Sequence, residues 1–199
     1  EPTAYMAPTI VGLGGAIGVI RYVLPDFVRN LKRGIFLTKR YVLISISNLN
    51  YSIQRSLLLF SLMTVAVTGM LAVLAANQNS PREFTTGVIG YIVVVVLLVV
   101  SIIYKLSMEA LTRKTLFVNL WKIGYTRKEL RKIVRQEVIS YYFVLILIPL
   151  VYIMFISGRF IYYGDMSLQF AYIYILSYII PIIVSGFITY VQYINAVVK

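Results

Sequence analysis

Long apolar stretches alternate with shorter polar connections along the chain. About 20 apolar residues in a helix are enough to cross the hydrocarbon core of a bilayer. Five stretches reach this length, and in chain order they are Tyr5 to Leu24, Leu57 to Ala76, Gly87 to Leu106, Val138 to Ile156, and Leu168 to about Tyr193. The pattern predicts an all-α integral membrane protein with about five transmembrane helices.

Basic side chains are concentrated in alternate connections between these stretches. Seventeen of the 19 Lys and Arg residues lie at 21–55, at 105–135 or at the C-terminal Lys199, and the other two are Arg82 and Arg159. Connections rich in Lys and Arg stay on the cytoplasmic side of a membrane. We therefore expect residues 25–56, residues 107–137 and the C-terminus in the cytoplasm, with the N-terminus and the connections 77–86 and 157–167 outside.

The composition fits a chain solvated by lipid and limits the chemistry that it can perform. Hydrophobic residues make up 60% of the chain, and the mean hydropathy is +0.85. There is no cysteine and no histidine, so thiolate nucleophiles, the commonest general base and the commonest metal ligands are absent. Because topology explains the net charge of +12, we expect no nucleic acid partner.

Three regions follow from these patterns. Residues 1–25 form the first predicted span, residues 26–56 a cytoplasmic connection, and residues 57–199 a four-helix transmembrane domain. Within the connection, Thr38 to Arg55 has the imperfectly amphipathic pattern of an elbow helix lying along the membrane surface. The chain has no initiator Met and no basic start before its first apolar stretch, so we expect it to be a fragment of a longer protein.

The cytoplasmic segment 107–137 is more organised than an ordinary loop. Glu109 and Arg113 have helical i, i+4 spacing, which extends the preceding span toward Trp121, and Gly124 is a plausible helix stop. Thr126 and Glu129 have the spacing of a capping box, so we expect a new short helix from Arg127. Leu130, Ile133 and Val134 share its apolar face, between Arg127, Lys128, Arg131, Lys132 and Arg135. Such a helix could transmit force, or it could simply attract anionic lipid.

Glycines, prolines and tyrosines mark further candidate positions within the spans. Gly14 and Gly18 have the GxxxG spacing that lets helices approach closely, although a glycine-tolerant membrane helix is an equal alternative. Pro149 and Pro181 are candidate kinks. Tyrosines near the ends of the spans, namely Tyr141, Tyr142, Tyr162, Tyr163 and Tyr172, are interpreted as anchors at the headgroup level.

Several functional signatures are absent from the sequence. Without a GxxxxGK[ST] phosphate loop, any ATP must be hydrolysed by another chain. No acidic or basic residue lies near the middle of a predicted span, which disfavours an ion-coupled transporter and an intramembrane enzyme. We therefore expect a noncatalytic protein with no metal or cofactor of its own.

The stretch from Tyr104 to Val138, YKLSMEALTRKTLFVNLWKIGYTRKELRKIVRQEV, resembles the FtsX-like permeases of ABC transporters. The likeness lies in a span ending in Tyr-Lys, a Ser-x-Glu segment and a Lys-x-Gly-x-[ST]-x-x-Glu turn, and it is greatest to the bacitracin-export type. Residues 44–67 also look like the segment leading into a later span of those permeases. The resemblance covers roughly residues 38–149.

The resemblance implies a membrane subunit that works with a separate ATPase dimer, which would hold ATP and Mg on the cytoplasmic side. The residues implied in ATPase coupling are Gly124, Tyr125, Thr126, Arg127, Lys128, Glu129, Leu130, Arg131 and Ile133. Further implied partners are the remaining permease segments or a second permease copy, and a membrane histidine kinase. The implied setting is the bacterial cell membrane, and the implied role is resistance to peptide antibiotics. The alternative is a membrane scaffold or signalling module that binds a kinase or a division protein without transport.

Overall fold

The computed structural model describes residues 18, 48–49, 51–78, 80–164 and 166–197 of the 199-residue chain. Four long helices account for most of them: α4 (Leu57–Ala76), α5 (Pro81–Lys122), α6 (Arg127–Tyr162) and α7 (Leu168–Val197). Each of these four is long and apolar enough to cross a membrane. The prediction of an all-α membrane protein is therefore confirmed, while the first predicted span and most of the predicted elbow helix lie outside the described residues.

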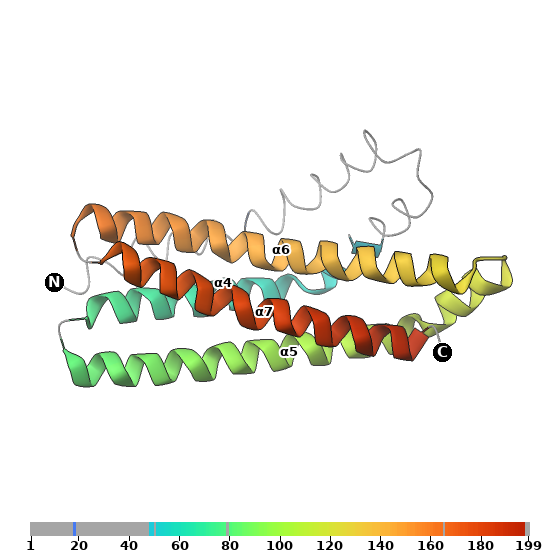
Figure 1. The fold of residues 1–199 in the computed structure, drawn as a ribbon, viewed down its shortest axis with the longest axis horizontal. Coiled ribbons are helices and arrows are strands. Elements are labelled where there is room, and N and C mark those ends of the chain that lie inside the picture. The colour runs from blue at the N-terminus through green and yellow to red at the C-terminus, as the bar shows by residue number, and fades with distance from the viewer. Residues whose placement is uncertain (1–17, 19–47, 50, 79, 165, 198–199) are drawn as a thin grey trace.

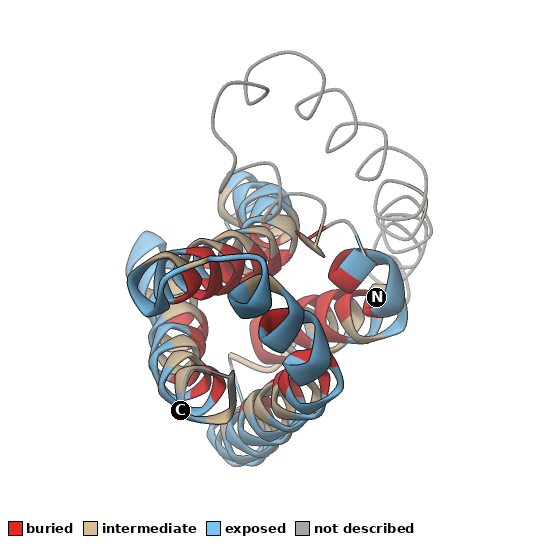
Figure 2. Cartoon of the chain, turned by 90° about the vertical axis from the view of Figure 1, so that its right-hand side faces the viewer, coloured by how far each residue is buried: buried red, intermediate tan, exposed pale blue. Residues whose placement is uncertain are grey.

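The four helices form an antiparallel bundle in which each helix packs against two neighbours (Figure 1). Helix α5 packs against α4 and α7, and α6 packs against the same two helices, so that α5 and α6 lie diagonally across the bundle. Buried residues face the interior and exposed residues form the outer ring (Figure 2). Large apolar side chains such as Leu97, Phe155 and Phe187 are more than half exposed, as expected where the neighbour is lipid.

Helix lengths differ more than the apolar pattern alone suggests. At 1.5 Å per residue, the 20 residues of α4 span about 30 Å, which matches the hydrocarbon core, whereas the 42 residues of α5 reach about 63 Å. The C-terminal part of α5 and the N-terminal part of α6 project past the end of α7 and the start of α4 (Figure 1). We call residues 107–137 the basic hairpin.

The separate short helix predicted from Arg127 is wrong in one respect. A helix does start at Arg127, but it runs without interruption to Tyr162 and includes the whole predicted fourth span. Leu130, Ile133 and Val134 pack in the same continuous core as Val138 and Leu145, so no break is needed between the two segments. The basic hairpin is thus a rigid extension of two spans.

Tyr141 and Tyr142 are not the headgroup anchors that their positions predicted. They are only 1% and 6% exposed, respectively. The Tyr142 hydroxyl hydrogen-bonds with Thr189 of α7 at 2.8 Å, and the Tyr141 hydroxyl donates to Ser56 at 3.1 Å. The first bond joins α6 to α7, and the second joins α6 to the residue that precedes α4. Tyr162, Tyr163 and Tyr172 are exposed, in keeping with the anchor interpretation.

Helices α6 and α7 continue through Pro149 and Pro181. A proline has no amide hydrogen, so the carbonyl four residues earlier loses its helical donor. For Pro149 this carbonyl belongs to Leu145, and it accepts a 3.0 Å hydrogen bond from the buried Tyr178 hydroxyl of α7. The neighbouring helix thus supplies the missing donor, as membrane interiors require.

Candidate functional site: the basic hairpin and its buried ion network

The turn of the basic hairpin is built from the two residues that the sequence analysis selected. Gly124 follows the end of α5 with a φ of +104°, a conformation that side chains with a Cβ rarely adopt. At Thr126 the capping box is complete: Glu129 accepts from the Thr126 backbone amide at 2.8 Å, and the Thr126 hydroxyl accepts from the Glu129 amide at 3.4 Å. Both predicted elements of the turn are confirmed.

The residues implied in ATPase coupling fall into two groups. Arg127, Lys128 and Arg131 are exposed, whereas Leu130 and Ile133 are 3% and 0% exposed. Leu130 and Ile133 therefore hold the hairpin together and are covered within the chain. Tyr125 is half-buried and packs against the same core.

The outer surface of the basic hairpin is strongly positive. Seven of its basic residues are exposed, and they are Lys114, Lys122, Arg127, Lys128, Arg131, Lys132 and Arg135. Two of its three acidic residues, Glu109 and Glu137, are buried, and the third, Glu129, belongs to the capping box. Burial of the acids leaves a surface suited to an acidic partner.

Two large apolar side chains are exposed near the turn. Trp121 is 60% exposed and Ile123 is 76% exposed. Helix α5 continues for 17 residues beyond Lys105, where its apolar stretch ends, so the turn lies about 25 Å from that level. Exposed apolar groups this far beyond the apolar part of the bundle are typical of a protein-binding surface.

Arg113 lies at the centre of a buried polar network at the base of the hairpin. Its guanidinium forms ion pairs with Glu137 of α6 and, at 2.6 Å, with Glu109 one turn earlier in α5. It also donates to the Ser52 hydroxyl at 2.8 Å and to the Asn48 carbonyl at 3.3 Å. One side chain thus joins the segment before α4, helix α5 and helix α6.

The remaining polar groups extend this network toward the bundle. The Ser52 hydroxyl donates to Glu109 at 2.5 Å, and the Asn48 amide donates to Glu137 at 3.4 Å. Ser56 donates to the Ser52 carbonyl and accepts from Tyr141. Because buried charges are costly unless they are paired and hydrogen-bonded, these contacts are what make burial of Arg113 tolerable.

Sequence analysis found the Glu109–Arg113 spacing but missed Glu137 and the role of Ser52. Glu137 lies in a row of basic residues and reads as a surface acid, so its pairing with Arg113 appears only once α5 and α6 are folded together. Asn48 and Ser52 are spaced i, i+4 on one face of the predicted elbow helix, which is the signal that could have pointed to them.

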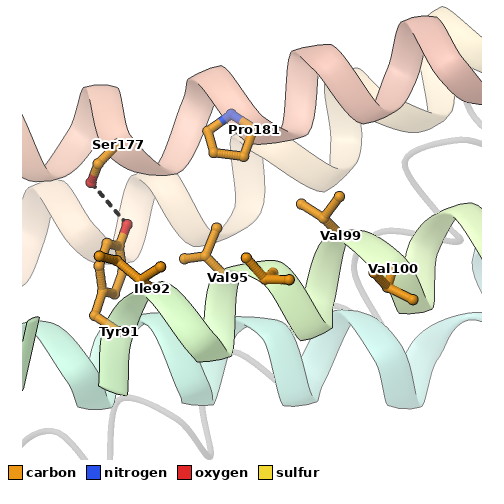
Figure 3. A pocket seen from close by; sticks show the side chains of 8 residues that line it. Tyr91, Ile92, Val95, Val99, Val100, Ser177 and Pro181 are labelled. Carbon is orange, nitrogen blue, oxygen red and sulfur yellow. Dashed lines mark hydrogen bonds between the residues drawn. The ribbon is translucent and has the colours of Figure 1, made fainter. Parts of the chain in front are cut away.

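A second feature is an apolar groove between α5 and α7 with a volume of about 260 Å³ (Figure 3). Its lining comprises Tyr91, Ile92, Val95, Val96, Val99 and Val100 of α5 with Ser177 and Pro181 of α7. Figure 3 shows the Tyr91 hydroxyl pointing across to Ser177, with which it hydrogen-bonds at 3.0 Å. The lining carries no ionisable group other than Tyr91, so it suits apolar material.

Two other predicted features contribute little to a site. Gly14 lies outside the described residues and Gly18 is the single described residue of its span, so the close helix approach stays a prediction. Among the residues that the structure describes, no group of three or more Asp or Glu residues comes together that could hold a metal ion.

Comparison with known proteins adds no relative of this chain. No protein-family model, no curated protein and no solved structure matches it.

Proposed function

We propose that this chain is the noncatalytic transmembrane permease subunit of an ABC transporter. A separate ATPase dimer, which binds ATP and Mg, acts on the basic hairpin from the cytoplasm, and the continuous helices α5 and α6 carry the displacement into the membrane. The work done there is removal or sensing of antimicrobial peptides, together with a membrane histidine kinase. This last, finer part rests only on the family resemblance of residues 104–138 and 44–67.

The observation that carries the proposal is the projecting, capped and positively charged hairpin. A motor can act through a membrane only if a stiff element links the two sides. Helices α5 and α6 are uninterrupted over 42 and 36 residues, and the capping box fixes the turn between them. An ordinary loop between spans would bend under load, whereas this hairpin would move as a unit.

The buried network supports the same proposal from the other end of the hairpin. Arg113 and its partners join the hairpin to residues 48–56, immediately before α4. A push on the turn would therefore be passed to α4 as well as to α5 and α6. Charge–charge contacts inside a low-dielectric region are stiff because breaking one leaves an unpaired charge.

The test is purification of the full-length tagged protein in mild detergent, followed by mass spectrometry of bound proteins. We expect an ATPase that contains the GxxxxGK[ST] loop. Arg127→Glu with Arg131→Glu should lower its recovery at least about tenfold, because two attractive contacts become repulsive. The matched control is Arg82→Glu with Arg159→Glu, which makes the same change in charge at the other end of the bundle.

Equal recovery of the ATPase with both double variants would contradict the role of the hairpin. If no ATPase is recovered with the unaltered protein, the permease proposal is wrong. A histidine kinase or a division protein in its place would favour the alternative, a membrane scaffold or signalling module without transport.

A further inference from the structure

Two basic residues, Arg55 and Lys105, mark the level at which the bundle changes from apolar to polar. Arg55 lies two residues before the start of α4, and Lys105 lies at the end of the apolar stretch of α5. Hydrogen bonds place both at one level: Lys105 donates to the Tyr141 hydroxyl, which in turn donates to Ser56, the neighbour of Arg55. If α4 spans the hydrocarbon core, this level is that of the lipid headgroups.

Lys105 has donors that its protein neighbours do not use. Its ammonium group is half-buried and makes one long hydrogen bond, 3.5 Å to the Tyr141 hydroxyl, while also lying 5.5 Å from the Tyr141 ring centroid. Among the described residues, no carboxylate lies within 4.0 Å of it. Glu109, one turn further along α5, attracts Lys105, but Arg113 and Ser52 hold one of its carboxylate oxygens and share its charge. An ammonium group has three donors, so at least two remain available.

Arg55 is the second cation of this pair. It directly precedes Ser56, which the Tyr141 hydroxyl links to Lys105, so the two cations lie at the same end of the bundle. Its single hydrogen bond within the described residues runs to the hydroxyl of exposed Tyr51, one turn away, at 3.4 Å. Arg55, Lys105 and Arg113 carry three positive charges against the two carboxylates of Glu109 and Glu137, so an anion that both Arg55 and Lys105 can bind would balance the remaining charge.

We propose that Arg55 and Lys105 together bind the phosphate of an anionic phospholipid from the membrane leaflet that surrounds this end of the bundle. The phosphate oxygens would accept hydrogen bonds from the free donors of Lys105 and from the guanidinium of Arg55. The acyl chains of the lipid would continue along the apolar faces of α4 and α5. This site is separate from the turn of the basic hairpin, which lies about 25 Å further along α5.

The experiment is native mass spectrometry of the full-length protein in a zwitterionic detergent, titrated with phosphatidylglycerol. The unaltered protein should keep one phosphatidylglycerol molecule that survives delipidation. Lys105→Met and Arg55→Gln should each bind it about fivefold or more weakly, since a basic residue near an anionic surface contributes about a fivefold change in binding. Lys114→Met, which removes an exposed charge of the same helix beyond the headgroup level, should bind it normally.

Two further arms identify the source of the phosphate and exclude a folding defect. Addition of inorganic phosphate should not displace the lipid, because only the lipid also buries its acyl chains. Phosphatidylglycerol should raise the Tm of the unaltered protein and of Lys114→Met, but not that of Arg55→Gln, whose Tm without lipid should be unchanged because Arg55 is exposed.

Equal binding by all three variants would overturn the site, as would displacement by inorganic phosphate. Binding lost equally in Lys114→Met would also overturn it, because the protein would then attract anionic lipid only through its total charge.

Discussion

Arg113 of α5 and Glu137 of α6 form an ion pair inside the bundle, where their side chains are only 9% and 6% exposed. The pair joins the two helices that otherwise lie diagonally across the bundle and make few contacts with each other. Asn48 also hydrogen-bonds to Glu137, and Ser52 accepts from Arg113. This contact fixes the base of the hairpin relative to the segment that enters α4.

Removal of one member of this pair should be strongly destabilising. Glu137→Ala leaves Arg113 buried with one carboxylate partner, and loss of one partner of a buried pair costs about 3–5 kcal/mol. We expect a lower Tm in detergent micelles, measured by circular dichroism. Glu83→Ala, at an exposed acid of α5, is the matched control and should leave the Tm nearly unchanged.

The double variant Arg113→Leu with Glu137→Leu separates pairing from simple loss of volume. Arg113→Leu alone leaves two buried carboxylates, Glu109 and Glu137, without their cation, whereas the double variant leaves only Glu109, so the double variant should be more stable than the sum of the single variants predicts. Additive losses from Arg113→Leu and Glu137→Leu would show that the two side chains act independently.

The span pattern and the turn of the hairpin could be predicted from sequence because their causes are local. The lengths of the apolar stretches predicted the four described helices. The backbone freedom of Gly124 and the capping side chain of Thr126 predicted the end of α5 and the start of α6. The continuity of α6 was missed because its charged first turns and its apolar body differ in composition. A helix can nevertheless continue from a charged segment into an apolar one, because both form the same backbone hydrogen bonds.

The buried network could not be predicted because burial is decided by tertiary packing. Glu137 and Tyr141 have sequence neighbours typical of a membrane surface, yet both face the interior once α6 packs against α4. The sequence around Glu137 gives no indication that its partner is Arg113. Only the arrangement of three segments brings Glu137, Arg113 and Ser52 together.

Loss of the Thr126 cap should loosen the start of α6. Thr126→Ala removes the side-chain acceptor for the Glu129 amide, and such a change costs about 1 kcal/mol. Hydrogen exchange of the amides in the first turn of α6 should become about fivefold faster, as read by mass spectrometry. Thr112→Ala, in the middle of α5, is the control. If the amides of residues 127–130 exchange as slowly in Thr126→Ala as in the unaltered protein, the role of the cap is contradicted.

Gly124 and Gly158 should respond in opposite ways to alanine. Neither has an atom within 4 Å of a built Cβ, so space does not distinguish them, but Gly124 has a φ of +104° whereas Gly158 lies within α6. Gly124→Ala should lower the Tm through backbone strain of about 1–3 kcal/mol, and Gly158→Ala should raise it slightly through better helix propensity. A Tm that rises for Gly124→Ala would show that the turn adopts another conformation.

The bond from Tyr178 to the Leu145 carbonyl should matter because residue 149 is a proline. Tyr178→Phe keeps the ring and removes the hydrogen bond to that carbonyl, and hydrogen bonds between membrane helices contribute about 0.6 kcal/mol on average and up to about 1.7 kcal/mol. We expect a loss at the upper end, since the carbonyl lacks its helical donor. Tyr172→Phe, at an exposed tyrosine of α7, should leave the Tm unchanged.

A second substitution shows whether the proline is the reason. Pro149→Ala restores an amide that can donate to the Leu145 carbonyl within α6. Tyr178→Phe should then cost less in the Pro149→Ala background than in the unaltered protein, and the difference between the two Tm losses measures the coupling. Equal losses in both backgrounds would mean that Tyr178 stabilises the α6–α7 contact through packing of its ring, independently of the carbonyl that the proline leaves without a helical donor.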